Sequence, residues 1–166
     1  LFQELRIDLP DDLRFKEKVT TLLNDAQELQ KDGNTGSALL KFREVLKYDK
    51  KNATATYFVN SIQARANLNG AYARIQSGNR RGAIPLLIAA SPFLPEARAR
   101  LASLRAEMRG EVGGIFAQGV AQFKNKKYQE CINTMNLVLM IDPGNREAEI
   151  YKEKSGKRAK AVSAIR

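Results

Sequence analysis

Apolar side chains recur along this chain every three or four residues, the spacing of helices that bury one face. Short polar segments rich in glycine, asparagine and proline interrupt the pattern, and such segments are typical of turns. We therefore expect an apolar lead-in at residues 1–10, followed by an all-α chain of about seven helices. The expected helices run over about residues 11–31, 35–48, 53–76, 80–91, 96–123, 128–141 and 146–166.

Each expected helix carries an apolar stripe that predicts its buried face. In the first four helices the stripe comprises Phe15, Val19, Leu22, Ala26 and Leu29; Ala38, Leu39, Phe42, Val45 and Leu46; Phe58, Ile62, Ala66 or Arg65, Leu68, Ala71, Tyr72 and Ile75; and Ala83, Leu87 and Ala90. Further along it comprises Leu101, Leu104, Met108, Tyr128, Cys131, Ile132, Met135, Val138, Leu139, Ala148, Tyr151, Val162 and Ile165.

Two places interrupt the helical pattern. Pro85 lies inside the fourth helix, where it removes a backbone hydrogen bond, so this helix is expected either to start near Ile84 or to kink. Glycines at 110, 113 and 114 fall inside the fifth helix. They either break it or let it bend, and we favour a bent continuous helix.

Small, aromatic and proline positions over residues 119–145 resemble a tetratricopeptide repeat, a helix-turn-helix unit of about 34 residues. In that family's pattern the positions include a small residue of the first helix, an aromatic after the turn, an alanine, an aromatic and a closing proline. Here they hold Gly119, Tyr128, Cys131, Met135 and Pro143. Two earlier segments are similar to the same pattern, through Ala26, Gly33, Ala38, Phe42 and Asn52, and through Ala71, Gly78, Ala83 and Pro95.

The repeat in this chain is longer than the family norm. Ala38 and Ala83 are 83 − 38 = 45 residues apart, and Ala83 and Cys131 are 131 − 83 = 48 apart. The surplus lies in the first helix of each pair, which is therefore expected to be extended. The resemblance implies one domain of stacked antiparallel helix pairs over residues 11–166. Its units would be residues 11–52, 53–95 and 96–145, with a capping helix at 146–166.

Members of this family hold other proteins, and their first helices line a concave groove. Carried over by position, the groove set is Leu23, Gln27, Gln30, Leu68, Tyr72, Ile75, Phe116, Val120 and Phe123. The last six are mostly apolar or aromatic and suit an amphipathic helix or an extended apolar peptide. The alternative is that they pack on neighbouring helices or on an adjoining domain. One variant of the family grips a peptide carboxylate with a set of lysine and asparagine residues. Only Asn69 of this chain matches that set, so this kind of binding is not supported.

Composition narrows the function classes. The 166 residues include no histidine, which removes the commonest general base and zinc ligand. The single cysteine, Cys131, is interpreted as a small buried apolar residue rather than a nucleophile. No apolar run approaches the roughly 20 residues of a membrane helix. We therefore expect a non-enzymatic protein without a cofactor or metal, cytoplasmic or the soluble part of a longer chain.

The net charge of +10 indicates an affinity for anionic partners without choosing among them. Basic residues gather in the last expected helix, at Lys152, Lys154, Lys157, Arg158 and Lys160. This basic patch is interpreted either as the solvated face of a capping helix or as a site for an acidic partner, a phosphate backbone or a membrane surface. The leading prediction is thus a scaffold that binds a partner peptide or helix, or a second copy of itself. The alternative is an electrostatic binder of nucleic acid or an anionic surface.

Overall fold

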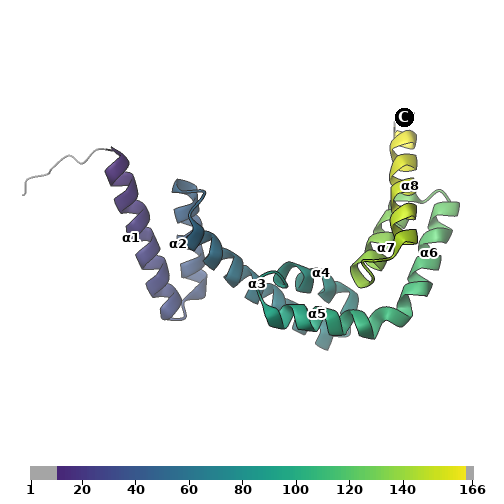
Figure 1. The fold of residues 1–166 in the computed structure, drawn as a ribbon, viewed down its shortest axis with the longest axis horizontal. Coiled ribbons are helices and arrows are strands. Elements are labelled where there is room, and N and C mark those ends of the chain that lie inside the picture. The colour runs from purple at the N-terminus through teal and green to yellow at the C-terminus, as the bar shows by residue number, and fades with distance from the viewer. Residues whose placement is uncertain (1–10, 164–166) are drawn as a thin grey trace, which may run out of the picture. The chain divides into compact units, whose positions relative to one another are not determined.

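The computed structural model describes residues 11–163, and this part of the chain is helical, without strands. Figure 1 shows the succession of helices joined by short turns. The helices are α1 (Asp11–Lys31), α2 (Thr35–Tyr48), α3 (Ala53–Gln76), α4 (Arg80–Ala90), α5 (Pro95–Met108), α6 (Val112–Lys124), α7 (Tyr128–Ile141) and α8 (Arg146–Ser163), with a 3₁₀ turn η1 (Arg109–Glu111) between α5 and α6. The all-α prediction is confirmed. The lead-in at 1–10 and Ile165 lie outside the described residues.

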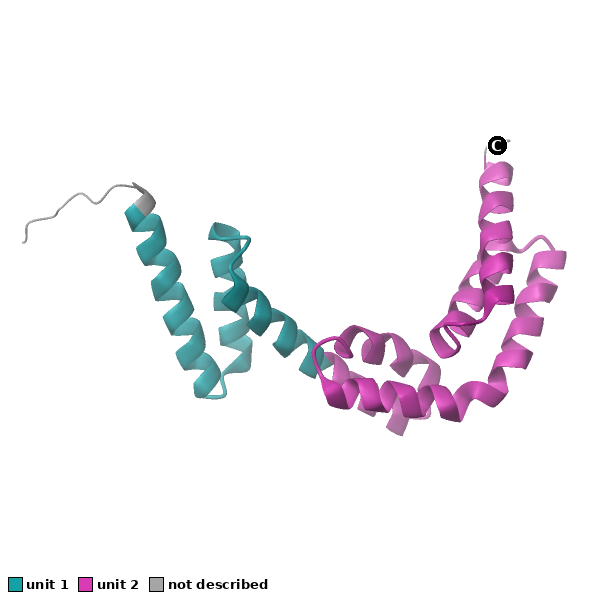
Figure 2. Cartoon of the chain, in the orientation of Figure 1, with its two compact units in different colours: residues 1–66 teal, residues 67–166 magenta. Residues whose placement is uncertain are grey.

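The chain divides into two compact units, residues 1–66 and 67–166, and the division falls inside α3 (Figure 2). The first unit holds α1, α2 and the beginning of α3. The second holds the rest of α3 and all later helices. The single domain with boundaries after residues 52, 95 and 145 stays a prediction.

The first unit is built around Phe42, which is fully buried and stacks on Phe58 with ring centroids 4.7 Å apart. Two short turns bring α1, α2 and α3 together. The Asn34 side chain caps α2 by accepting a hydrogen bond from the Ser37 N–H, at the left-handed turn around Gly33. The core of this unit comprises Val19, Leu22, Ala26, Ala38, Phe42, Val45 and Ala55. Phe15 was expected in it but is 42% exposed, because it precedes the part of α1 that this core covers.

Helix α3 buries opposite faces in its two halves. Ala55, Phe58, Val59 and Ile62 face the core of the first unit, whereas the buried residues Ala64, Leu68 and Ala71 lie on the other side of the helix. Ala64 follows Ala55 by nine residues, or about two and a half helical turns, so the two side chains lie on opposite sides of α3. The single stripe predicted for this helix was therefore wrong in part. It placed Tyr72 and either Ala66 or Arg65 inside, and all three are exposed, while it missed Ala55 and Ala64.

In the second unit, the end of α3 pairs with α4. Gly70 lies so close to α4 that an added Cβ would be 3.2 Å from the Leu86 Cδ1 atom. The Arg74 guanidinium Nη1 donates a hydrogen bond of 2.7 Å to the Gly82 carbonyl. These contacts join the two helices across the turn at residues 77–79.

Helix α4 begins at Arg80, five residues before Pro85, so the expected later start near Ile84 was wrong. The Asn79 side chain caps it, accepting a hydrogen bond of 2.9 Å from the Gly82 N–H. This cap holds the first turn in place, and Pro85 sits on the exposed side of the helix. Ile84, which the sequence pattern missed, is fully buried beside it.

Helices α5 and α6 form one bent helical run, as predicted. The backbone stays in the right-handed helical region at Met108, Arg109, Glu111 and Val112, and it tightens into a 3₁₀ turn at 109–111. Figure 1 shows the direction of the chain changing between α5 and α6. Helix α5 packs on α4, and α6 packs on α7. Counted as one helix, this run gives the seven that were expected.

The last three helices pack as α6 on α7 and α7 on α8. Gly119 makes the first contact possible, because a Cβ there would overlap the Met135 Cε atom and lie 3.2 Å from the Thr134 Cγ2 atom. Met135 itself is fully buried. Ala38, Ala83 and Cys131, which define the predicted repeat, are fully buried as well, one in each of α2, α4 and α7.

We expect Gly119→Val to destabilise the protein by about 1–3 kcal/mol, since the β-branched side chain has to displace both Met135 and Thr134. Gly113→Val is the matched control, because Gly113 is also a helical glycine of α6 but has no atom within 4 Å of an added Cβ. Urea unfolding of the two variants checks this. Equal midpoints would contradict a close contact at Gly119.

Candidate partner-binding surfaces

An aromatic stripe runs along α6. Phe116, Val120 and Phe123 are spaced by four and three residues, so they lie on one side of the helix, and each is half-buried. The Tyr151 ring of α8 packs against both phenylalanines edge-to-face, with ring centroids 5.7 Å from Phe116 and 5.5 Å from Phe123. The structure therefore brings these three predicted groove residues together, and α8 covers part of them.

The stripe extends beyond the predicted set. Phe123 also packs on Tyr128, the first residue of α7, with centroids 5.6 Å apart. The Lys154 Nζ atom lies 5.9 Å from the centre of the Tyr151 ring. Sequence reasoning placed Tyr128 and Tyr151 among inward-facing residues. Helical spacing alone could not distinguish a core position from one at the edge of a surface cluster.

The groove residues predicted in α3 differ from one another in exposure. Leu68 is 2% exposed and packs inside the second unit. Ile75 is half-buried, whereas Tyr72 is 41% exposed and offers the largest open area of the three. Tyr72 is thus the member of this set best placed to contact a partner.

The groove residues predicted in α1 belong to the first unit. Leu23, Gln27 and Gln30 are half-buried, and Leu23 packs against the core around Phe42. Within the described residues, the Gln30 Oε1 atom is buried and has no hydrogen-bond partner. A buried acceptor without a partner costs about 1–3 kcal/mol. This set is therefore more polar than the aromatic stripe of α6, although the residues of both are half-buried.

The structure does not gather the predicted basic patch on one side of α8. Lys152, Lys157 and Lys160 line an open depression of about 520 Å³ together with Ile132 of α7. Arg158 lines a second one of about 720 Å³, which includes Tyr128 and Val162. Val162 was expected to face inward, but it is 47% exposed because α8 continues past the first residue of α7.

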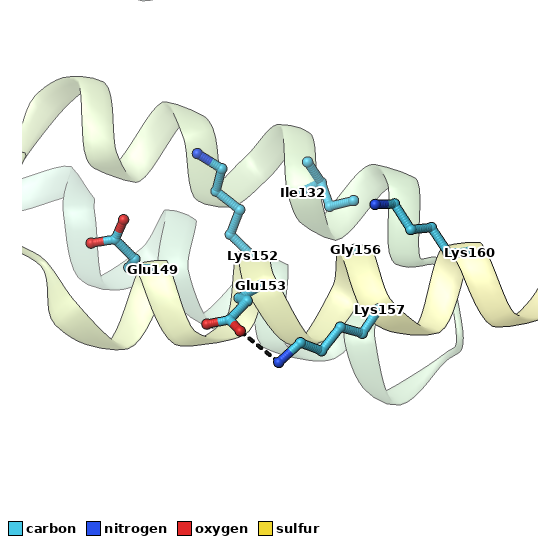
Figure 3. A pocket seen from close by; sticks show the side chains of 7 residues that line it. All are labelled: Ile132, Glu149, Lys152, Glu153, Gly156, Lys157 and Lys160. Carbon is cyan, nitrogen blue, oxygen red and sulfur yellow. Dashed lines mark ion pairs between the residues drawn. The ribbon is translucent and has the colours of Figure 1, made fainter.

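The first depression has an apolar floor and a charged rim (Figure 3). Ile132 and Gly156 form the floor, and an added Cβ on Gly156 would have no atom within 4 Å. Lys152 and Lys160 reach toward α7 on either side of Ile132. The Lys157 ammonium is instead 2.6 Å from the Glu153 carboxylate, and its hydrogen bond lowers the pKa of that carboxyl group. Glu149 completes the lining.

Residues 11–163 contain no group of three or more histidine, cysteine, aspartate or glutamate side chains placed to hold a metal ion. Cys131 is fully buried between helices. Over the same residues, no helix combines the length and apolar character required to span a membrane.

The chain matches no protein-family model, and no curated protein matches its sequence.

Proposed function

We propose that this chain is a non-enzymatic interaction module, similar to tetratricopeptide repeats, that binds a peptide or helix of a partner protein along α6. The observation that carries the proposal is the aromatic stripe of Phe116, Val120 and Phe123, which remains partly open to solvent with Tyr151 at its edge. Aromatic side chains, phenylalanine included, are enriched in the cores of protein interfaces. The paired helices supply a rigid support for this surface.

The stripe indicates the kind of partner. Its three residues span two turns of α6, so an amphipathic helix with apolar residues at a similar spacing is complementary to them. Tyr128 and Lys154 extend the surface with a hydroxyl and an ammonium group. The partner is therefore expected to be apolar along one side, with a polar or acidic margin.

A second candidate is an electrostatic binder of nucleic acid or an anionic surface through α8. It is favoured by the exposure of Lys154, Lys157, Arg158 and Lys160. The two candidates differ in their dependence on salt. Counterion release makes phosphate binding fall steeply with ionic strength, whereas contacts of apolar side chains change little.

We expect partners captured from a lysate of the source cells to stay bound at high salt and to be lost on Phe116→Ala with Phe123→Ala. Phe93→Ala is the matched control, because Phe93 is 46% exposed in the turn before α5 and lies outside the stripe. Lys157→Glu with Arg158→Glu tests the electrostatic candidate in the same assay. Circular dichroism establishes that each variant is folded. If every partner survives the aromatic double substitution in a folded protein, the proposed surface is wrong.

A further inference from the structure

We propose that the depression between α7 and α8 is a second docking surface, separate from the α6 stripe, and that its occupant is an acidic amphipathic helix of a protein partner. It lies on another side of α8 from Tyr151. Gly156 follows Tyr151 by five residues, which rotates it by about 140° around the helix. The two surfaces can therefore be tested independently.

The floor of this depression accepts a close helix approach. Gly156 is half-buried, yet an added Cβ would meet no atom within 4 Å, so the backbone of α8 is open to a partner at this point. Ile132 of α7 lies beside it and is half-buried. Because glycine has no side chain, Gly156 leaves space beside Ile132 in which an apolar side chain of a partner can pack.

The rim carries the charge that selects the partner. Among the described residues, Lys152 and Lys160 form no ion pair, whereas Lys157 is bound to Glu153. Lys152 and Lys160 are eight residues apart, or about 12 Å along the axis of α8. Acidic side chains seven or eight residues apart on a partner helix lying along α8 match this spacing. Apolar residues midway between them would lie over Ile132 and Gly156.

The same features disfavour nucleic acid as the occupant. A phosphate backbone gains nothing from the apolar floor formed by Ile132 and Gly156. Bases bind single-stranded sites by stacking on aromatic side chains. The aromatic ring of α8, Tyr151, is occupied by Phe116 and Phe123 on another side of the helix. An acidic helix uses both the floor and the rim.

The test measures fluorescence anisotropy of a labelled synthetic helical peptide with glutamates seven residues apart and leucines midway between them. We expect saturable binding that Gly156→Leu weakens by about tenfold or more, because the new side chain fills the seat of the peptide's leucines. Gly113→Leu is the matched control, being a helical glycine with equally open surroundings in α6. Circular dichroism monitors folding, and neither change is expected to lower the melting temperature.

A second experiment reverses the charge of two lysines on the rim of the depression. Lys152→Glu with Lys160→Glu should abolish binding of the acidic peptide and create binding of the same peptide with lysines in place of its glutamates. Lys50→Glu with Lys51→Glu alters the net charge equally, at exposed positions of the first unit, and should leave binding unchanged. The proposal is overturned if the acidic peptide does not bind, or if Gly156→Leu leaves its affinity intact. It is overturned equally if a single-stranded oligonucleotide of matched charge binds more tightly and is lost with the same variants.

Discussion

Phe42→Ala is expected to cost about 3–5 kcal/mol of folding free energy, the largest single effect in the first unit. Phe42 is fully buried, and its ring stacks on Phe58 at 4.7 Å with the planes 8° apart. Truncation removes this stacking and leaves a cavity among α1, α2 and α3. Domains are stable by roughly 5–15 kcal/mol in total, so the loss is a large share. Thermal melting followed by circular dichroism should show an earlier and less cooperative transition.

Hydrogen exchange localises this effect. Amides of α1 and α2 should lose protection in Phe42→Ala, whereas amides of α7 and α8 should keep theirs, because they belong to the other compact unit. Phe93→Ala, at a residue that is 46% exposed, should change the stability by no more than about 0.5 kcal/mol. An unaltered melt of Phe42→Ala would contradict the core that we describe for the first unit.

Leu87→Ala should destabilise the second unit by about 2–5 kcal/mol. Leu87 is fully buried on α4, and α4 packs on both α5 and α7. Truncation therefore leaves a cavity at the buried face of α4. Urea unfolding should show a lower midpoint at an unchanged slope, which reports a loss of stability without a change in the surface exposed.

Ile150→Ala provides the comparison for Leu87→Ala, since Ile150 lies in the same unit and is 48% exposed. Its effect should be a fraction of that of Leu87→Ala. If the two variants have the same midpoint, Leu87 does not belong to the core of this unit. In Leu87→Ala, the amides of α4 and α5 should lose protection from hydrogen exchange, whereas the amides of α1 should keep theirs.

Most of the fold could be predicted from the sequence because its turns carry strong local signals. Asn34 and Asn79 cap the helices that follow them, and Gly33 and Gly78 take the left-handed conformations of the preceding turns. Periodicity located the second helices well, since Ala38, Ala83 and Cys131 are each buried on a single consistent face. Local chemistry and tertiary packing agree at these places.

The prediction of buried residues failed in α3, where the two halves of one helix pack against different neighbours. In α3 the buried side changes between Ile62 and Ala64, so a stripe drawn along the whole helix mixes exposed residues such as Arg65 with buried ones. No local signal marks this change, because it depends on which helices pack against each half.

The prediction of the candidate site was limited in a similar way, because it too depends on how the helices pack. Phe116, Val120 and Phe123 were identified by spacing, but their contacts with Tyr151 depend on where α8 packs. The five basic residues of α8 were grouped because they are close in sequence. Around a helix they point in different directions, and the structure assigns them to two depressions and one aromatic ring. Ile132 lies on α7 and Gly156 lies on α8. Because they are far apart in the sequence, the sequence pattern did not group them into one binding surface.

The two-sided burial of α3 bears on how cooperatively the molecule melts. Its backbone ladder passes from one unit into the next without interruption. When one unit unfolds, the half-helix left behind loses its continuation, but it keeps the side-chain contacts on its own buried side. Fraying is then confined to roughly the turn nearest the boundary, because helix ends lose order within about one turn. Unfolding of one unit is thus expected to appear in the other as lost hydrogen-exchange protection at the α3 amides near residue 66.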